Sequence, residues 1–138
     1  MDDAEQVEIW PVEQIPNAAR LFYRVHIGQL LDKQLHPGIF REQGGAMSTD
    51  WENYSTPEES RNRAAQPQQN GIVALVVATI HSIEPLKVRH EPTRTNRAHS
   101  AVHGLGASED VSTKVRRTRI RAKLFEYFHT WEIDPFSR

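Results

Sequence analysis

Two segments of the chain carry the apolar patterns of β-strands. Residues 21–26, LFYRVH, are rich in aromatic and β-branched side chains and predict a strand. Its period of two places Arg24 and His26 on one face, together with Phe22. The other face is apolar and consists of Leu21, Tyr23 and Val25. Residues 72–80, IVALVVATI, are apolar without interruption, so we expect a strand that is buried on both faces and lies at the centre of a sheet.

A helix is predicted directly before this apolar run, in the segment YSTPEESRNRAA. Thr56 and Glu59 fit a capping box, in which each side chain bonds the backbone of the other, and Pro57 suits the first helical position. We expect this helix to run to about Ala65, where QPQQNG ends it.

A second helix is favoured over residues 108–128. Ser108 is a suitable cap, and acidic residues follow it at the positive end of the helix dipole. The expected apolar stripe consists of Val111, Val115, Thr118, Ala122 and Phe125. The alternative is a strand, because residues 117–124, RTRIRAKL, alternate between charged and uncharged side chains.

Shorter strands are expected at residues 86–90, 97–104 and 129–133. Strands and helices that follow no regular β-α-β order are typical of the α+β class. We therefore predict a single α+β domain over residues 19–138, with a mainly antiparallel sheet and two helices. Residues 1–18 are acidic, contain two prolines and predict an extended arm.

The composition narrows the class of protein. The chain has 138 residues, enough for one domain, and its formal net charge of −1 gives no overall attraction to nucleic acid or to an anionic membrane. The absence of cysteine excludes disulfides, thiolate zinc sites and cysteine nucleophiles. The first residues lack the apolar run of a secretory signal, and the longest apolar stretch is far shorter than the ~20 residues that span a bilayer. We expect a cytoplasmic protein of prokaryotic type without a membrane segment.

A cluster of basic side chains occupies residues 87–103. It contains four Lys or Arg and three His against a single acid, Glu91. On the strand expected there, Arg97, His99 and His103 share one face, where guanidinium and imidazole groups together suit the oxygens of a phosphate. The alternative interpretation is a polar outer face on an edge strand, which keeps the sheet from pairing with other chains.

These histidines do not predict a metal site. His99 and His103 are four residues apart, which suits zinc ligands on a helix. On a strand they lie ~13 Å apart, too far to share one ion. The chain also has no HExxH motif. We expect no bound metal.

A second basic run, KVRRTRIRAK, covers residues 114–123. On a helix its arginines flank the apolar stripe, as they do on an ordinary solvated helix whose long side chains cover apolar neighbours. The same arrangement also suits contacts with a nucleic-acid backbone. The residues that would make such contacts are Arg116, Arg117, Arg119 and Arg121.

The order of segments in the first two thirds of the chain resembles that of ADP-ribosyltransferase-like domains. A strand bearing Tyr23 and Arg24 precedes the segment MSTDW, then a helix and a buried strand. The resemblance implies that Arg24, Ser48 and Thr49 hold the nicotinamide and phosphates of NAD, with His26 nearby. The chain also resembles a group of small prokaryotic proteins with no assigned activity, which share the YRxH, MSTDW-then-helix and AH segments.

One departure from this pattern bears on activity. Active transferases of that family usually present a late glutamate, and here the corresponding strand offers RAHSAVHG instead. An imidazole does not stabilise a developing oxocarbenium ion as a carboxylate does. The pattern therefore favours phosphate handling over ordinary ADP-ribosylation.

Two classes of function follow from these residues. The first is a cytoplasmic binding or accessory protein without a cofactor, which recognises a phosphate-bearing small molecule, RNA or DNA through its Arg/His cluster. The second is a transferase that uses NAD or an RNA phosphate. A shared site requires Arg24 and His26 to lie on the same side of the sheet as Arg97 and His99, although more than seventy residues separate them.

Overall fold

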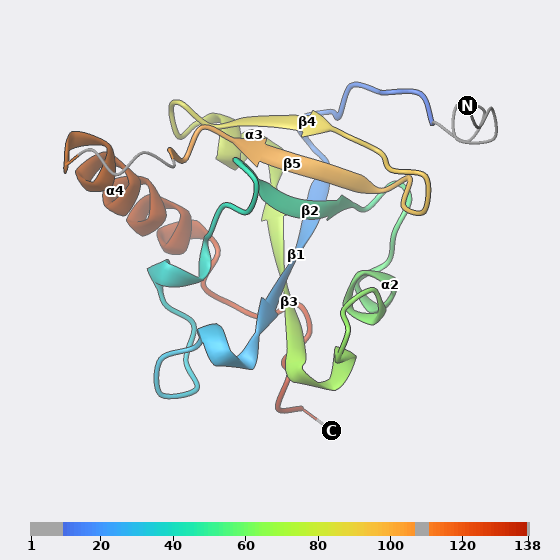
Figure 1. Ribbon diagram of the computed structural model, residues 1–138, viewed down its shortest axis with the longest axis horizontal. Helices are drawn as coiled ribbons and strands as arrows, with labels where there is room; N and C mark the ends of the chain where they lie inside the picture. Colours follow the sequence, from blue (N-terminus) through green and yellow to red (C-terminus); the bar gives the residue numbers. More distant parts are fainter. Residues whose placement is uncertain (1–9, 107–110, 138) are drawn as a thin grey trace.

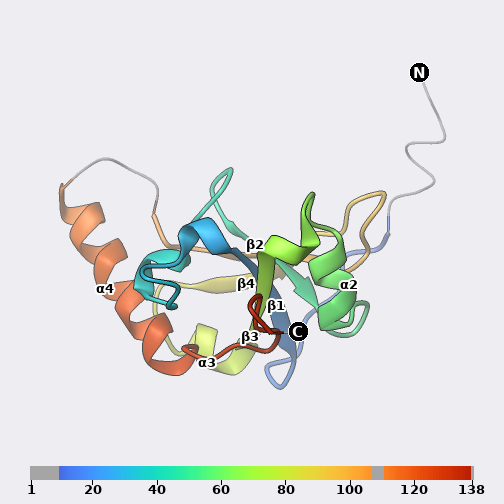
Figure 2. The same cartoon turned by 90° about the horizontal axis from the view of Figure 1, so that it is seen from below.

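The computed structural model describes residues 10–106 and 111–137 and confirms an α+β fold (Figure 1). The sheet is antiparallel and five-stranded, with the order β3-β1-β2-β5-β4. The strands are β1 (Arg20–His26), β2 (Met47–Trp51), β3 (Asn70–Val76), β4 (Lys87–His90) and β5 (His99–His103). The helices are α2 (Pro57–Asn62), α3 (Val77–His81) and α4 (Val111–Tyr127), one more than expected. Figures 1 and 2 show α4 and α2 at opposite ends of the sheet.

The prediction of a central strand at 72–80 is wrong in position and in length. β3 is an edge strand, and it ends at Val76, which pairs with the first residue of β1, Arg20. The next two amides, of Val77 and Ala78, donate to the carbonyl oxygens of Ala19 and Asn17 just before β1. The chain then turns into α3, which buries Val77 and Ile80 in the core. Because apolar runs of this length suit strands and buried helices alike, the sequence alone did not separate the two.

The outer edge of β3 is covered by the C-terminal segment. Ile72 and Ile133 exchange backbone hydrogen bonds of 2.9 and 3.1 Å, the single bridge formed by the segment in which a final strand was expected. Gly71 permits this approach, since a Cβ there would lie 2.6 Å from the carbonyl oxygen of Ile133. The cover explains how an edge strand carries an uninterrupted apolar sequence.

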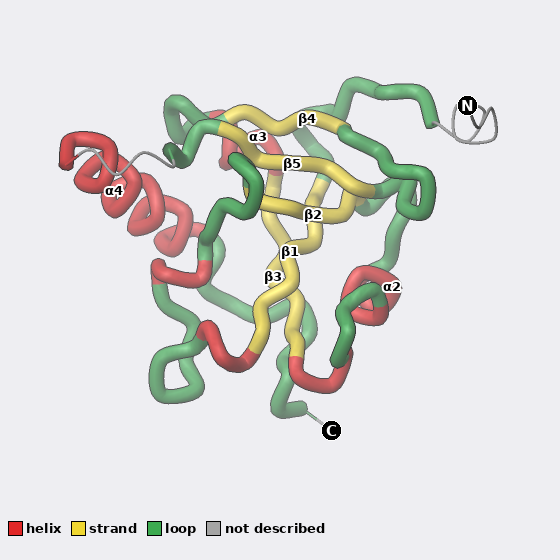
Figure 3. Tube along the Cα trace, viewed as in Figure 1, coloured by secondary structure: helices red, strands yellow, loops and turns green. Residues whose placement is uncertain are grey.

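One face of the sheet forms the hydrophobic core. Leu21 and Val25 of β1 are fully buried there, as the period of two predicts. They belong to the same apolar cluster as Leu75, Phe40 and Leu124, which come from β3, the loop before β2, and α4. Long loops with short 3₁₀ turns connect β1 to β2 (Figure 3).

The capping box of the first predicted helix is confirmed. The Thr56 hydroxyl accepts from the Glu59 amide at 3.0 Å, and the Glu59 carboxylate accepts from the Thr56 amide at 2.8 Å. The helix ends at Asn62, three residues earlier than expected. α2 lies against β1 and β3 on the side of the sheet opposite the core.

The second predicted helix is also confirmed, but of the five residues of its expected apolar stripe only Phe125 packs against the core. Val111 and Val115 are 75% and 52% exposed, and the contact with the core is made mainly by Ile120, Leu124 and Phe128. These three follow one another at four-residue spacing, with Ile120 and Leu124 on α4 and Phe128 directly after its last residue. The expected cap, Ser108, lies outside the described residues.

The helices of the described part of the chain are all too short or too polar to cross a bilayer.

Replacing Leu75 by alanine is expected to destabilise the protein by ~2–5 kcal/mol, because the side chain is fully buried and its removal leaves a cavity. Urea denaturation followed by circular dichroism measures this loss. Val115→Ala, on the exposed side of α4, is the control and is expected to change the free energy of unfolding by less than about 0.5 kcal/mol. A loss below 1 kcal/mol for Leu75→Ala contradicts its place in the core.

Candidate functional site

The register of the strands brings five of the predicted site residues to one side of the sheet, namely Arg24, His26, Ser48, His99 and His103. Phe22 of β1 pairs with Asp50 of β2, and Asp50 pairs with His99 of β5. Since alternate residues share a face, Arg24 and Ser48 lie on this same face, which we call the outer face. The outer face is opposite the core, so Arg24, His26 and His99 share one side of the sheet, as a shared site requires. Arg97 does not join them, because it precedes β5 and its guanidinium contacts Tyr54 and Trp10.

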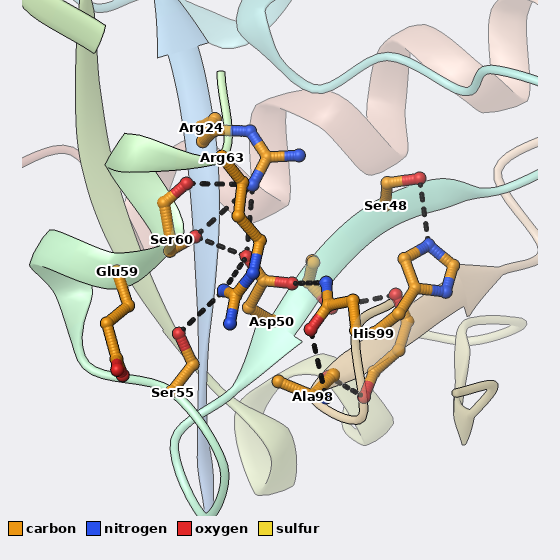
Figure 4. Close-up of polar contacts among 12 residues, drawn as sticks. Arg24, Ser48, Asp50, Ser55, Glu59, Ser60, Arg63, Ala98 and His99 are labelled. Atoms are coloured by element: carbon orange, nitrogen blue, oxygen red, sulfur yellow. Dashed lines mark hydrogen bonds and ion pairs between the residues drawn. The ribbon is translucent and has the colours of Figure 1, made fainter. Parts of the chain in front are cut away.

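The centre of the outer face is a buried carboxylate, that of Asp50, which is 1% exposed. Figure 4 shows the two guanidinium groups of Arg24 and Arg63 converging on it. Oδ2 accepts hydrogen bonds from Arg24 Nη1 at 3.0 Å, Arg63 Nη1 at 3.1 Å and Ser60 Oγ at 2.5 Å. Oδ1 accepts from Asn96 Nδ2 at 2.8 Å. Both oxygens of the buried charge are therefore bonded, as burial of a carboxylate requires.

This network fixes the position of Arg24 but does not neutralise its charge completely. One carboxylate faces two guanidinium groups, whose side chains are 32% and 30% exposed. Arg24 makes its hydrogen bonds to described residues through Nη1 alone, to Asp50 and to Ser60. Its Nε and Nη2 atoms remain available to solvent or to a ligand.

Ser48 and His99 form a hydrogen-bonded pair next to this network. His99 Nε2 lies 3.3 Å from Ser48 Oγ, and His99 Nδ1 lies 2.7 Å from the carbonyl oxygen of Glu91 (Figure 4 shows the pair). A carbonyl oxygen only accepts, so Nδ1 carries a proton. In the neutral ring Nε2 then holds a lone pair and accepts the hydroxyl proton of Ser48.

Two acids pair with the predicted cluster. The carboxylate of Glu91 lies 2.6 Å from His103 Nε2, and Asp50 lies within the group of arginines. Glu91 therefore holds both histidines, one through its carboxylate and the other through its backbone carbonyl.

A small cavity opens beside Ser48, where β1 and β2 separate. The two strands pair only at Leu21 and Phe22, and beyond these residues they diverge. A space of about 80 Å³ remains, lined by Tyr23, Arg24, Gln29, Arg41, Gln43 and Ser48. All six side chains carry a hydrogen-bond donor, and two of them, those of Arg24 and Arg41, carry a positive charge.

Tyr23 holds the cationic wall of this cavity in place. Its hydroxyl donates to the carbonyl oxygen of Ile39 at 2.6 Å and accepts from the backbone amide of Arg41 at 3.1 Å. Burial raises the pKa of the Tyr23 hydroxyl, so it keeps its proton at neutral pH. The Arg41 side chain bonds Gly38 through Nε, which leaves its terminal nitrogens directed to no acceptor among the described residues.

Three predicted site residues are used elsewhere. His26 Nδ1 accepts from the amide of Gly28 at 2.9 Å and caps a 3₁₀ turn, although it lies on the outer face of β1. Thr49 points to the core face and donates to the Ser100 carbonyl. Arg97 precedes β5, and its guanidinium lies between the rings of Tyr54 and Trp10, at 4.1 and 4.7 Å from their centroids.

The arginines of α4 divide into two pairs. Arg117 donates to the carbonyl of Gly106 at 2.6 Å and Arg121 to that of Phe40 at 2.7 Å, so both attach the helix to the domain. Partial burial lowers the pKa of Arg121. Arg116 and Arg119 are exposed. The basic run is therefore partly structural.

A larger cavity of about 570 Å³ lies beside the edge strand β4, lined by His81 and residues 84–89. Its lining is more apolar than that of the smaller cavity, and both ring nitrogens of His81 already have partners in Asn17 and Val88. We therefore place the candidate site at the smaller, more polar cavity. Within residues 10–106 and 111–137, no group of three or more metal-ligating side chains is arranged to hold an ion.

Comparison of the chain with protein-family models, curated proteins and solved structures found no match. The resemblance to ADP-ribosyltransferase-like domains thus stays a prediction.

Asp50 was missed by the sequence analysis, as were Arg41, Arg63 and Asn96. One signal was present, since the alternation of MSTDW places Asp50 on the same face as Ser48. The partners of Asp50 lie 10 to 46 residues away along the chain. No local pattern identifies such partners.

Asp50→Asn is expected to lower the free energy of unfolding by about 3 kcal/mol, because it leaves two guanidinium groups without their shared counter-charge. This loss is at the low end of the range for a broken buried ion pair, because water can still solvate the two partly exposed arginines. Urea denaturation measures the loss, with Glu126→Gln on the exposed side of α4 as the control of equal charge change. Equal stability of the two variants contradicts a structural role for the network.

Proposed function

We propose that the protein binds a phosphate-bearing ligand in the cavity between β1 and β2. The observation that carries this proposal is the convergence of Arg24 and Arg41 on a small space that also faces Gln43 and Ser48. Phosphate oxygens are acceptors, and arginine side chains bind them with charge-assisted hydrogen bonds.

The charge around the cavity supports an anion. Asp50 is the carboxylate nearest to Arg24, and it is shared with Arg63 and buried behind both. The carboxylate of Glu42 is turned to the amide of Gly106 and that of Glu91 to His103. The outer face continues the positive charge along β4, where Lys87 and Arg89 are exposed.

Preorganisation supports binding as well. Arg24 is fixed by the Asp50 network, and the backbone of Arg41 is fixed by Tyr23. Donors that are already held in place lose little conformational entropy when a ligand binds. The size of the cavity, about 80 Å³, suits the phosphate group itself, with the remainder of the ligand lying along the outer face.

We also propose that the protein is located in the cytoplasm. Phosphate esters and nucleotides are cytoplasmic metabolites, and a chain without cysteine is compatible with that compartment.

Titration with inorganic phosphate tests the proposal. We expect the side-chain resonances of Arg24 and Arg41 and the imidazole resonances of His99 to shift in NMR spectra at moderate ionic strength. Arg41→Gln removes one charged donor and is expected to weaken binding roughly tenfold. ADP and a short RNA oligonucleotide, titrated in parallel, identify what the phosphate is attached to.

Arg119→Gln is the matched control, because Arg119 is exposed on α4 and its replacement changes the net charge equally. It is expected to leave phosphate affinity within twofold. Equal weakening by both variants indicates a general charge effect, and the absence of any shift with all three probes shows that the cavity is not an anion site.

A further inference from the structure

Ser48, His99 and the carbonyl of Glu91 form a chain of hydrogen bonds, and anion binding alone does not require such a chain. Ser48 is exposed, and its hydroxyl faces the lone pair of an imidazole whose other nitrogen is fixed by the Glu91 carbonyl. This is the order of groups that activates a serine: a nucleophile, a base, and an acceptor that orients the base. Here a backbone carbonyl stands in the position where many hydrolases have a carboxylate.

We propose that Ser48 is a nucleophile, activated by His99, for the hydrolysis of small carboxylic esters. The inference goes beyond the proposed anion binding and shares its cavity. The residues it assigns are Ser48 as the group that bonds to the acyl carbon and His99 as the base. The Glu91 carbonyl positions His99.

The backbone supports the orientation of the base. The Glu91 amide donates to the His99 carbonyl at 3.0 Å, while the His99 ring donates back to the Glu91 carbonyl at 2.7 Å. This reciprocal pair fixes both the position and the tautomer of the ring. A histidine that only keeps a sheet soluble does not need its tautomer set.

The reaction balances with water as the only co-reactant. Ser48 Oγ bonds to the ester carbonyl carbon as its proton passes to His99 Nε2, and the carbonyl electron pair moves onto oxygen. When the carbonyl re-forms, the bond to the alcohol oxygen breaks, and the alcohol leaves with the proton from Nε2. Water then attacks the acyl-serine, again giving its proton to Nε2, which returns that proton to Ser48 as the carboxylic acid is released.

The cavity supplies stabilisation for the oxyanion of both steps. Arg24, Arg41 and Gln43 line the same space as Ser48. Cationic and amide donors placed where negative charge develops lower the barrier for acyl transfer. The space of about 80 Å³ admits only a few heavy atoms, so a short acyl group such as acetyl is the class that fits.

Covalent labelling of the 138-residue chain tests the inference. The probe is a small alkyl fluorophosphonate, whose phosphorus is attacked by an activated serine with loss of fluoride. We expect peptide mapping by mass spectrometry to find the label on Ser48, and Ser48→Ala to abolish it. Hydrolysis of p-nitrophenyl acetate is expected to show the same dependence on Ser48.

His99→Gln is expected to slow labelling at least 100-fold, in the range that general bases contribute. His103→Gln is the matched control, since His103 lies on the same face of β5 and is bonded to the same residue, Glu91. It is expected to leave the rate within twofold. Circular dichroism verifies that each variant is folded.

The outcomes separate this inference from the proposed function. Phosphate-induced NMR shifts without label on Ser48 overturn the nucleophile and leave anion binding intact. Label on Ser48 that depends on His99, without any phosphate shift, supports the nucleophile and overturns anion binding. Labelling that is equally fast in the His99 and His103 variants shows that His99 is not the base.

Discussion

The carboxylate of Asp50 on β2 connects three further segments of the chain: β1, α2 with the residue that follows it, and the loop before β5. It accepts hydrogen bonds from Arg24 on β1, Ser60 on α2, Arg63 after that helix, and Asn96 before β5. A buried charge is costly unless it is fully paired, so the arrangement of these segments depends on completing its coordination. Because α2 and the loop before β5 both contribute, the same interaction shapes the outer face of the sheet.

The candidate site follows from that constraint. Arg24 is held by Asp50 on one side and borders the cavity between β1 and β2 on the other. Pairing between these strands is limited to two residue pairs, and the separation beyond them creates the space. The fold thus produces a polar cavity at the place where two strands part, bordered by an arginine that is already oriented.

Arg41 and the two histidines of the site are held by contacts that do not involve Asp50. Tyr23, on the core face of β1, fixes the backbone of Arg41, while Glu91 fixes His99 and His103 from the end of β4. One strand therefore organises the cavity from both faces, with Arg24 on the outer side and Tyr23 beneath. Binding and nucleophilic chemistry both need such fixed donors and acceptors, since loose groups lose entropy when they are ordered.

The sequence by itself determined which segments form β1, β4 and β5 and where α2 begins, because periodicity and capping are local properties. For α4 it favoured a helix and left a strand open, and the structure decided between the two. It also determined that Arg24 and His26 share a face of β1, and that His99 and His103 share a face of β5. Only the tertiary structure decided that β3 is an edge strand, that Ile120 and Leu124 face the core, and that Asp50 gathers its partners. Ser48 and His99 meet although 51 residues separate them. Strand order and side-chain partnership depend on packing between distant segments, and no local pattern records that packing.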